Sequence, residues 1–119
     1  MAKRILIVED DHSIRELLVE LLQGEGYDVT SAVNGLEGLK CLEQNSSFNL
    51  ILIDLMMPVM DGYTFRTEQM KNPKFSKIPV VVMSAEANAK EKLKSYGITA
   101  FLSKPVELDT IIKTVELYS

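Results

Sequence analysis

The stretch Leu50-Ile51-Leu52-Ile53-Asp54 decides the fold, because four consecutive large apolar residues lead directly to a single acid. An apolar run of this length without alternation is typical of a strand that is buried on both faces, as in a parallel sheet covered by helices. A structural role does not readily explain the acid at its end. The loop 55–62 follows, and Gly62 leads into a segment that we expect to be helical to about Met70.

Four further segments are expected to be strands, at residues 3–8, 27–31, 78–83 and 99–103. Helical segments alternate with them along the chain. Short buried strands that alternate with helices predict an α/β fold whose parallel sheet is covered on both faces. Right-handed crossovers leave few topologies, and a flavodoxin-like doubly wound sheet of order 2-1-3-4-5 with five helices fits best.

The helix signals differ in strength along the chain. Ser13 and Glu16 have the spacing of a capping box, and apolar residues then recur every three or four positions until Gly24. Residues 86–96 predict a weakly amphipathic helix that is rich in alanine and lysine, and the last helix follows Pro105. Together these helices would cover both faces of the sheet.

The composition is that of one globular domain, with 119 residues, 46% hydrophobic and 25% charged. The formal net charge of −4 is uneven, because residues 1–62 contain 11 acidic and 4 basic residues, and residues 63–119 contain 6 and 9. An acidic domain is a poor non-specific ligand for nucleic acid, and no apolar run approaches the roughly 20 residues that span a bilayer. We therefore expect neither nucleic-acid nor membrane binding.

The cysteine content and the N-terminal sequence indicate the cellular compartment. Cys41 is the single cysteine and has no partner for a disulfide within the chain. The apolar run near the N-terminus ends at Glu9, too early for a signal peptide. These features predict a reducing, cytoplasmic setting.

Polar residues follow the carboxyl ends of four expected strands. Because ligands of such sheets bind outside these ends, near the point where the strand order reverses, the residues there are candidates for a site. Strands 1 and 3 would be neighbours, so their carboxylates should converge. The candidates are Glu9, Asp10 and Asp11 at the end of strand 1, Asp54 at the end of strand 3, Ser84 at the end of strand 4 and Lys104 at the end of strand 5.

Such a group of side chains suits phosphoryl chemistry. Clustered carboxylates repel one another, and a hard divalent cation such as Mg²⁺ relieves that repulsion. A carboxylate can itself attack phosphorus to form an aspartyl phosphate. Asp54 would then be the nucleophile, while the ammonium of Lys104 and the hydroxyl of Ser84 would contact the phosphoryl oxygens.

Simpler interpretations apply to single residues. Ser84 alone is most often a helix cap, and Lys104 alone is most often a surface residue. His12 is the only histidine, so a His-based metal cluster or catalytic triad is disfavoured, and an exposed position at a helix start is expected. The methionines of the loop after Asp54, at positions 56, 57 and 60, are expected to pack rather than to bind metal.

Four segments, in order and at near-family spacing, give the chain its resemblance to a known family. They read ILIVEDD (5–11) with IREL (14–17) behind it, LILIDLMMPVMDG (50–62), IPVVVMSA (78–85) and FLSKP (101–105). The sequence resembles the receiver domain of two-component response regulators over essentially its whole length. Residues 1–119 would then be a single receiver domain without an output domain.

The resemblance implies that Asp54 accepts a phosphoryl group from a histidine kinase or a histidine phosphotransfer protein. Glu9 and Asp10 would be the acidic pair around Mg²⁺ or Mn²⁺, and Asp54 and the backbone carbonyl of Met56 would be further ligands. The domain would not be an enzyme beyond taking part in its own phosphorylation and slow dephosphorylation.

The resemblance also implies a switch. Ser84 would move to the phosphate, Lys104 would contact it, and Phe101 would pack inward as the aromatic switch residue. The Lys104-Pro105 bond would be cis. The face made by helix 4, strand 5 and helix 5 would then control a downstream protein or output domain, with homodimerisation on phosphorylation as a further expectation.

The sequence departs from the family pattern in two places, and two rival functions are considered. Phe101 stands where many relatives have tyrosine, and the segment from Ser84 to Gly97 is slightly shorter than usual. One rival is a pseudo-receiver that acts only as a protein-interaction scaffold. The other is a flavodoxin-like small-molecule binder or hydrolase, which the missing glycine-rich phosphate loops disfavour. Met56 also disfavours this second rival, because phosphatases that form an aspartyl phosphate need a second aspartate at this position.

Overall fold

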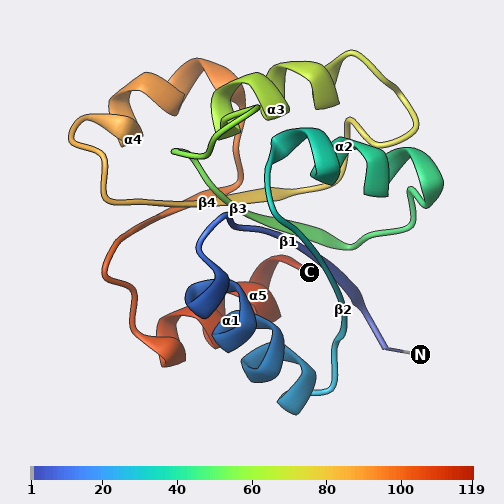
Figure 1. The fold of residues 1–119 in the computed structure, drawn as a ribbon, viewed down its shortest axis with the longest axis vertical. Coiled ribbons are helices and arrows are strands. Elements are labelled where there is room, and N and C mark those ends of the chain that lie inside the picture. The colour runs from blue at the N-terminus through green and yellow to red at the C-terminus, as the bar shows by residue number, and fades with distance from the viewer. Residues whose placement is uncertain (1) are drawn as a thin grey trace.

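The computed structural model describes residues 2–119 and contains one five-stranded parallel sheet of order β2-β1-β3-β4-β5, as predicted (Figure 1). The sheet joins residues that lie far apart in the sequence, since β1 pairs with both β2 and β3. Its strands are β1 (Arg4–Val8), β2 (Asp28–Ala32), β3 (Leu50–Asp54), β4 (Val80–Ser84) and β5 (Ala100–Ser103).

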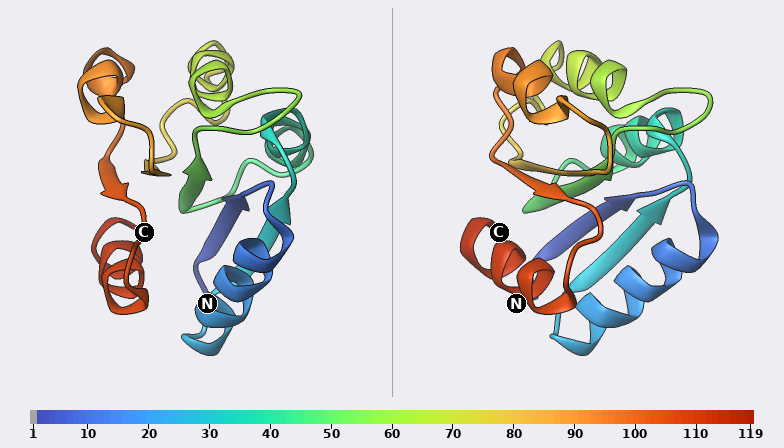
Figure 2. Two further views of the ribbon diagram at one scale, coloured as in Figure 1. Left: turned by 60° about the vertical axis from the view of Figure 1, so that its left-hand side comes forward. Right: turned by 90° about the vertical axis from the view of Figure 1, so that its left-hand side faces the viewer.

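Helices cover both faces of the sheet. The helices α2 (Gly35–Gln44), α3 (Gly62–Met70) and α4 (Ala89–Lys92) lie on one face, and α1 (His12–Gly24) and α5 (Leu108–Tyr118) lie on the other (Figures 1 and 2). A 3₁₀ helix, η1 (Leu93–Tyr96), continues directly from α4. None of the helices in residues 2–119 is both long and apolar enough to cross a bilayer.

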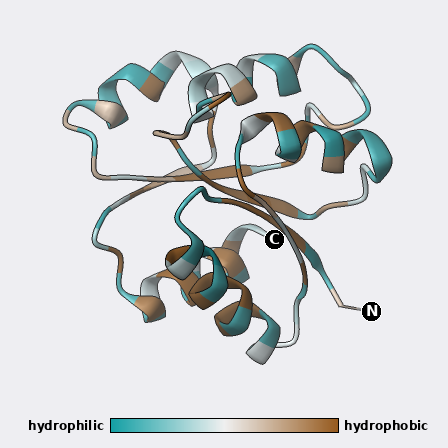
Figure 3. Cartoon of the chain, viewed as in Figure 1, coloured by the Kyte–Doolittle hydropathy of each residue, from teal (hydrophilic) through white to brown (hydrophobic). Residues whose placement is uncertain are grey.

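The two faces of the sheet carry separate apolar cores. Alternate residues of β1 and β3 point to opposite faces: Leu6 and Ile51 join the core under α2 and α3, whereas Ile5 and Leu50 join the core under α1 and α5. All four are fully buried. Apolar residues accordingly line the strands and the helix surfaces that face them (Figure 3). Burial on both sides explains the absence of alternation in the sequence of these strands.

The expected start of α1 at Ser13 is wrong. The helix begins at His12 and its N-cap is Asp11, whose carboxylate accepts a hydrogen bond of 3.0 Å from the backbone N–H of Ile14. Aspartate caps a helix as well as serine does. The helix begins early because the chain turns directly after Glu9, where the sheet ends.

The expected helix over residues 86–96 is confirmed only for residues 89–96. An α-helix of one turn, α4, occupies Ala89–Lys92, and the next turn tightens into η1. Asn88 adopts the left-handed conformation, with φ 66°, through which a right-handed helix cannot run. The α-helix therefore begins only after Asn88, at Ala89.

Most strand boundaries differ from the predicted ones by one or two residues. β3 ends in Asp54 and β4, which extends from Val80, ends in Ser84, as expected. Pro79 has no N–H to donate and precedes β4 instead of opening it. Two side-chain predictions are confirmed, because Cys41 is half-buried and His12 is exposed at the start of α1.

Candidate functional site

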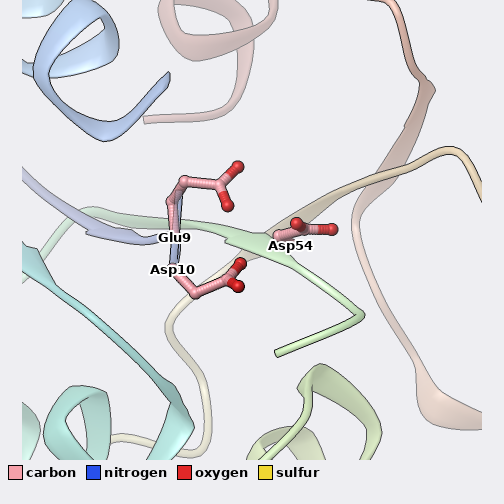
Figure 4. A group of neighbouring side chains, drawn as sticks. All are labelled: Glu9, Asp10 and Asp54. Carbon is pink, nitrogen blue, oxygen red and sulfur yellow. The ribbon is translucent and has the colours of Figure 1, made fainter. Parts of the chain in front are cut away.

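Three carboxylates meet where β1 and β3 end. Val8 of β1 is the register partner of Ile53 of β3, so the residues that follow them, Glu9 and Asp54, are also neighbours. One carboxylate oxygen from each of Glu9, Asp10 and Asp54 lies within 4.8 Å of the others. Figure 4 shows the Glu9 and Asp10 side chains extending from the end of β1 toward the side on which Asp54 lies, at the end of β3. The structure thus brings together acids that the sequence separates by 45 positions.

The three acids differ in their exposure to water. Glu9 is completely buried, Asp54 is 8% exposed and Asp10 is exposed. The pKa of Glu9 is raised from 4.5 to about 7. Burial is the largest cause, a hydrogen bond from Lys104 acts in the opposite direction, and the negative charge of Asp54 contributes to the rise. Glu9 therefore holds a proton more readily than an ordinary glutamic acid does.

Lys104 reaches the cluster from the loop after β5. Its ammonium donates to Oε1 of Glu9 over 3.0 Å and to Oδ2 of Asp54 over 3.1 Å. Burial acts to lower the pKa of Lys104, but these two carboxylates outweigh it and raise the pKa. The backbone N–H of Lys104 donates to the Ser84 carbonyl over 2.9 Å, which ties the loop to β4. The Lys104-Pro105 peptide bond is cis.

Local hydrogen bonds hold the acidic loop after β1. The guanidinium of Arg15, one turn into α1, donates to the carbonyls of Glu9 and Asp10 over 2.9 and 3.3 Å. The Glu9 carboxylate accepts from the Asp11 N–H over 3.2 Å, and the Glu9 N–H donates to the Ala32 carbonyl over 3.1 Å. The loop is thus anchored to both α1 and β2. We did not anticipate the role of Arg15 from the sequence, where it reads as an ordinary surface residue of a helix.

The remaining sequence-derived candidates surround this cluster. Ser84 ends β4 and is buried, and its Oγ accepts a hydrogen bond from the Glu86 N–H over 2.9 Å. Phe101 of β5 is half-buried and packs against the core beneath α2 and α3. Met56 is 60% exposed in the loop after β3, so the prediction that it packs is wrong, whereas Met57 is buried.

Close backbone packing shapes the loop that carries Met56. The Gly62 N–H donates to the Leu55 carbonyl over 2.8 Å, and the Gly35 N–H donates to the Met60 carbonyl over 3.0 Å. A Cβ atom on Gly62 would lie 2.9 Å from the Asp54 carbonyl oxygen. The absence of a side chain at this glycine therefore lets α3 begin directly beside the acidic cluster.

The donor set is suited to a hard divalent cation. Mg²⁺ is bound in proteins by one or two carboxylates together with other oxygen ligands. Glu9, Asp10 and Asp54 supply carboxylate oxygens within reach of one ion, and no histidine or thiolate takes part. The cluster fits Mg²⁺ or Mn²⁺ better than a metal that prefers nitrogen or sulfur.

Comparison with known families agrees with this geometry. The sequence model described as "Response regulator receiver domain" matches residues 5–116. The chain belongs to this family. It is a receiver domain, a signalling domain of two-component systems, and its sheet order is that of the fold to which its structural neighbours belong.

The relatives of this receiver domain include regulators and kinases. It is 32% identical over 118 residues, 98% of this chain and 56% of the relative, to the probable transcriptional regulator ycf29 of Porphyra purpurea. It is 37% identical over 118 residues, 97% of this chain and 12% of the relative, to the sensor histidine kinase RcsC of Escherichia coli strain K12. The chain thus spans about half, or much less, of the length of these curated relatives.

Solved structures resemble this receiver domain along its whole length. The chemotaxis protein CheY4 of Vibrio cholerae has a TM-score of 0.91 at 30% identity, with 100% of both chains covered. The response regulator TrrA of Thermotoga maritima, solved in complex with Mg²⁺ and BeF, has a TM-score of 0.87 at 32% identity, with 98% of this chain and 99% of that chain covered.

Proposed function

We propose that this receiver domain is a phosphoacceptor that receives a phosphoryl group on Asp54 from a histidine kinase or a histidine phosphotransfer protein in a Mg²⁺-dependent reaction. One observation carries the proposal: the Asp54 carboxylate lies both within 4.8 Å of the Glu9 and Asp10 carboxylates and 3.1 Å from the Lys104 ammonium. Negative and positive groups then flank one nucleophile, as phosphoryl transfer requires.

The reaction uses one oxygen of Asp54 as the nucleophile. That oxygen attacks phosphorus, a new P–O bond forms, and the bond from phosphorus to the donor breaks. With phosphohistidine the leaving group is the imidazole, whose nitrogen keeps the electron pair and takes a proton from water. With acetyl phosphate the leaving group is acetate. The Asp54 side chain is only 11% exposed, so little of its carboxylate is accessible to a phosphoryl donor.

The other residues stabilise the transferring group. Bound at Glu9, Asp10, Asp54 and the carbonyl of Met56, Mg²⁺ would neutralise charge on the phosphoryl oxygens. Lys104 exchanges its contact with Asp54 for one with a phosphoryl oxygen, and the Ser84 hydroxyl donates to another.

A change of output follows from these movements. When Ser84 moves toward the phosphoryl group, the space behind it is filled by Phe101, which rotates inward from its half-buried position on β5. The face formed by α4, β5 and α5 changes and controls a partner protein or an output domain, with homodimerisation through that face as one form of output. The new charge thus biases a two-state element.

Intact mass after incubation with Mg²⁺ and acetyl phosphate tests the proposal. We expect a single phosphoryl adduct that hydroxylamine removes and that Asp54→Asn abolishes. Asp61→Asn is the matched control, because Asp61 lies in the same loop and caps α3 through a bond of 2.8 Å from the Thr64 N–H, which asparagine can also accept. That variant should be phosphorylated like the wild type.

The opposite result supports the alternative function. A protein that stays unmodified, or that is modified elsewhere, would instead be a pseudo-receiver acting as an interaction scaffold. We further propose that residues 1–119 act as a single receiver domain whose partners are proteins rather than nucleic acid. The cytoplasmic location expected from the sequence stays a prediction.

A further inference from the structure

Glu86, in the loop between β4 and α4, joins three parts of the structure that the phosphoacceptor mechanism does not connect. Its backbone N–H donates to Oγ of Ser84 over 2.9 Å. Its carboxylate accepts a hydrogen bond of 2.8 Å from the Tyr63 hydroxyl of α3 and an ion-pair contact of 2.9 Å from the Lys92 ammonium of α4. One residue therefore links the Ser84 side chain to two helices.

The side chain of Glu86 anchors the loop between β4 and α4 to neighbouring helices. A hydrogen bond between a serine hydroxyl oxygen and the N–H two residues later is common in turns. The Glu86 carboxylate adds hydrogen bonds to Tyr63, which is 23 positions away in the sequence, and to Lys92, which is 6 positions away. Its neighbours in the loop, Ala85 and Ala87, are exposed, whereas Glu86 is half-buried. This side chain thus ties the loop between β4 and α4 to both α3 and α4.

The Tyr63–Glu86 hydrogen bond persists at neutral pH. Burial, followed by the hydrogen bond to Glu86, raises the pKa of Tyr63 to about 12, so its hydroxyl remains a donor. Hydrogen bonds from Lys92 and Tyr63 lower the pKa of Glu86, so its carboxylate remains a charged acceptor. The Tyr63 ring is itself fixed by packing on the Tyr96 ring, with 5.5 Å between centroids.

A rotation that carries the Ser84 hydroxyl toward Asp54 breaks its bond to the Glu86 N–H unless the Glu86 backbone follows. The backbone can follow only if the carboxylate releases Tyr63 or Lys92, or pulls α3 and α4 with it. We propose that Tyr63 and Lys92, acting through Glu86, are positioning residues that hold the Ser84 hydroxyl in the orientation seen here and so weaken the affinity of the site for a phosphoryl group. This inference rests on the proposed phosphoacceptor function.

Titration with beryllofluoride in the presence of Mg²⁺, followed by NMR, tests the inference without a partner protein. Beryllofluoride mimics a phosphoryl group on a carboxylate. Tyr63→Phe removes the hydroxyl and keeps the ring, and should lower the half-saturating beryllofluoride concentration roughly three- to tenfold, because a hydrogen bond to a charged acceptor is lost. Lys92→Met should shift it in the same direction by about twofold, as expected for an exposed ion pair.

Two controls separate positioning from a general structural effect. Tyr96→Phe is the matched variant, because the Tyr96 hydroxyl has no hydrogen-bond partner among the described residues, and it should titrate like the wild type. In a Ser84→Ala background, Tyr63→Phe should have no effect, since the group being positioned is gone. An effect of equal size in that background would overturn the inference.

The outcomes distinguish this inference from the function on which it rests. If the wild type binds beryllofluoride and gains a phosphoryl group, but Tyr63→Phe leaves the titration unchanged or shifts it to higher concentration, the positioning role is refuted and the phosphoacceptor function stands. If the wild type neither binds beryllofluoride nor gains a phosphoryl group, both are refuted.

Discussion

Glu9 and Lys104 form an ion pair of 3.0 Å in which the carboxylate is completely buried, although 95 positions separate the two residues in the sequence. The same ammonium contacts Asp54 over 3.1 Å. One lysine thus serves two carboxylates, and a buried acid with a shared partner is costly to keep ionised. The stability and ligand affinity of the domain should both depend on the charges of this cluster.

The first prediction concerns stability against pH. Without divalent cations, the free energy of unfolding should fall as pH rises from about 4.5 to about 7, because folded Glu9, with its pKa raised to about 7, holds its proton more tightly than unfolded Glu9 does. The stabilisation is complete below the unfolded pKa and is lost as pH passes the folded one, by about 3 kcal/mol. Urea denaturation with EDTA at several pH values measures it.

Glu9→Gln is the control for this prediction, because it keeps the size and removes the titration. Its free energy of unfolding should lack this fall between pH 5 and 7, so the two curves diverge. Parallel curves for the two proteins would show that Glu9 titrates at the same pH in the folded and unfolded states.

The second prediction concerns Mg²⁺ affinity. Asp10→Asn should weaken Mg²⁺ binding by about tenfold or more, because it removes a carboxylate from a cluster suited to a hard cation. Asp11→Asn removes the same charge one position away and retains the cap of α1, so it should change affinity far less. Calorimetric titration compares the two. Equal losses would indicate a general effect of charge rather than a ligand at Asp10.

The third prediction concerns Arg66 of α3, which is 7% exposed and has hydrogen-bond partners that are neutral oxygens. Its guanidinium donates to the carbonyls of Tyr96 and Gly97 over 2.9 and 2.8 Å, and to the Gln69 side chain over 2.7 Å. Arg66→Met leaves these acceptors unsatisfied and should lower the free energy of unfolding by about 2–4 kcal/mol.

Lys71→Met is the control for Arg66, because Lys71 is exposed at the end of α3 and, among residues 2–119, its ammonium forms an ion pair only with Glu68. Its effect should stay below about 1 kcal/mol. Amide exchange should also accelerate in η1 of the Arg66 variant, whose last carbonyls lose their donor. A variant as stable as the wild type would show that water replaces the guanidinium without cost.

The fourth prediction compares two glycines. In Gly62→Ala the new Cβ atom would lie 2.8 Å from a Leu55 methyl group and 2.9 Å from the Asp54 carbonyl oxygen, so the start of α3 must move and the domain should lose about 1–3 kcal/mol. In Gly24→Ala the Cβ atom meets nothing within 4 Å, at the end of α1, and stability should rise by about 0.5–1 kcal/mol. Thermal denaturation distinguishes the two signs.

Much of the fold was predictable because its signals are local. An apolar run such as residues 50–53 identifies a buried strand wherever it occurs, and the strand order followed from alternation and handedness. The errors occurred where two local signals competed. Asp11 and Ser13 were both good caps for α1, and the early turn of the chain favoured Asp11. The segment 86–96 had helical composition, yet Asn88 in a left-handed conformation shortened the helix.

The sequence by itself determined which residues end the strands, because run length and residue type are properties of neighbouring positions. It thereby marked Glu9, Asp10 and Asp54 as a candidate site. Only the tertiary structure decided which side chains support them. Contacts such as Tyr63 with Glu86, over 23 positions, and Lys104 with Glu9, over 95, form when the sheet and its helices pack, and no local pattern encodes the distance between such atoms.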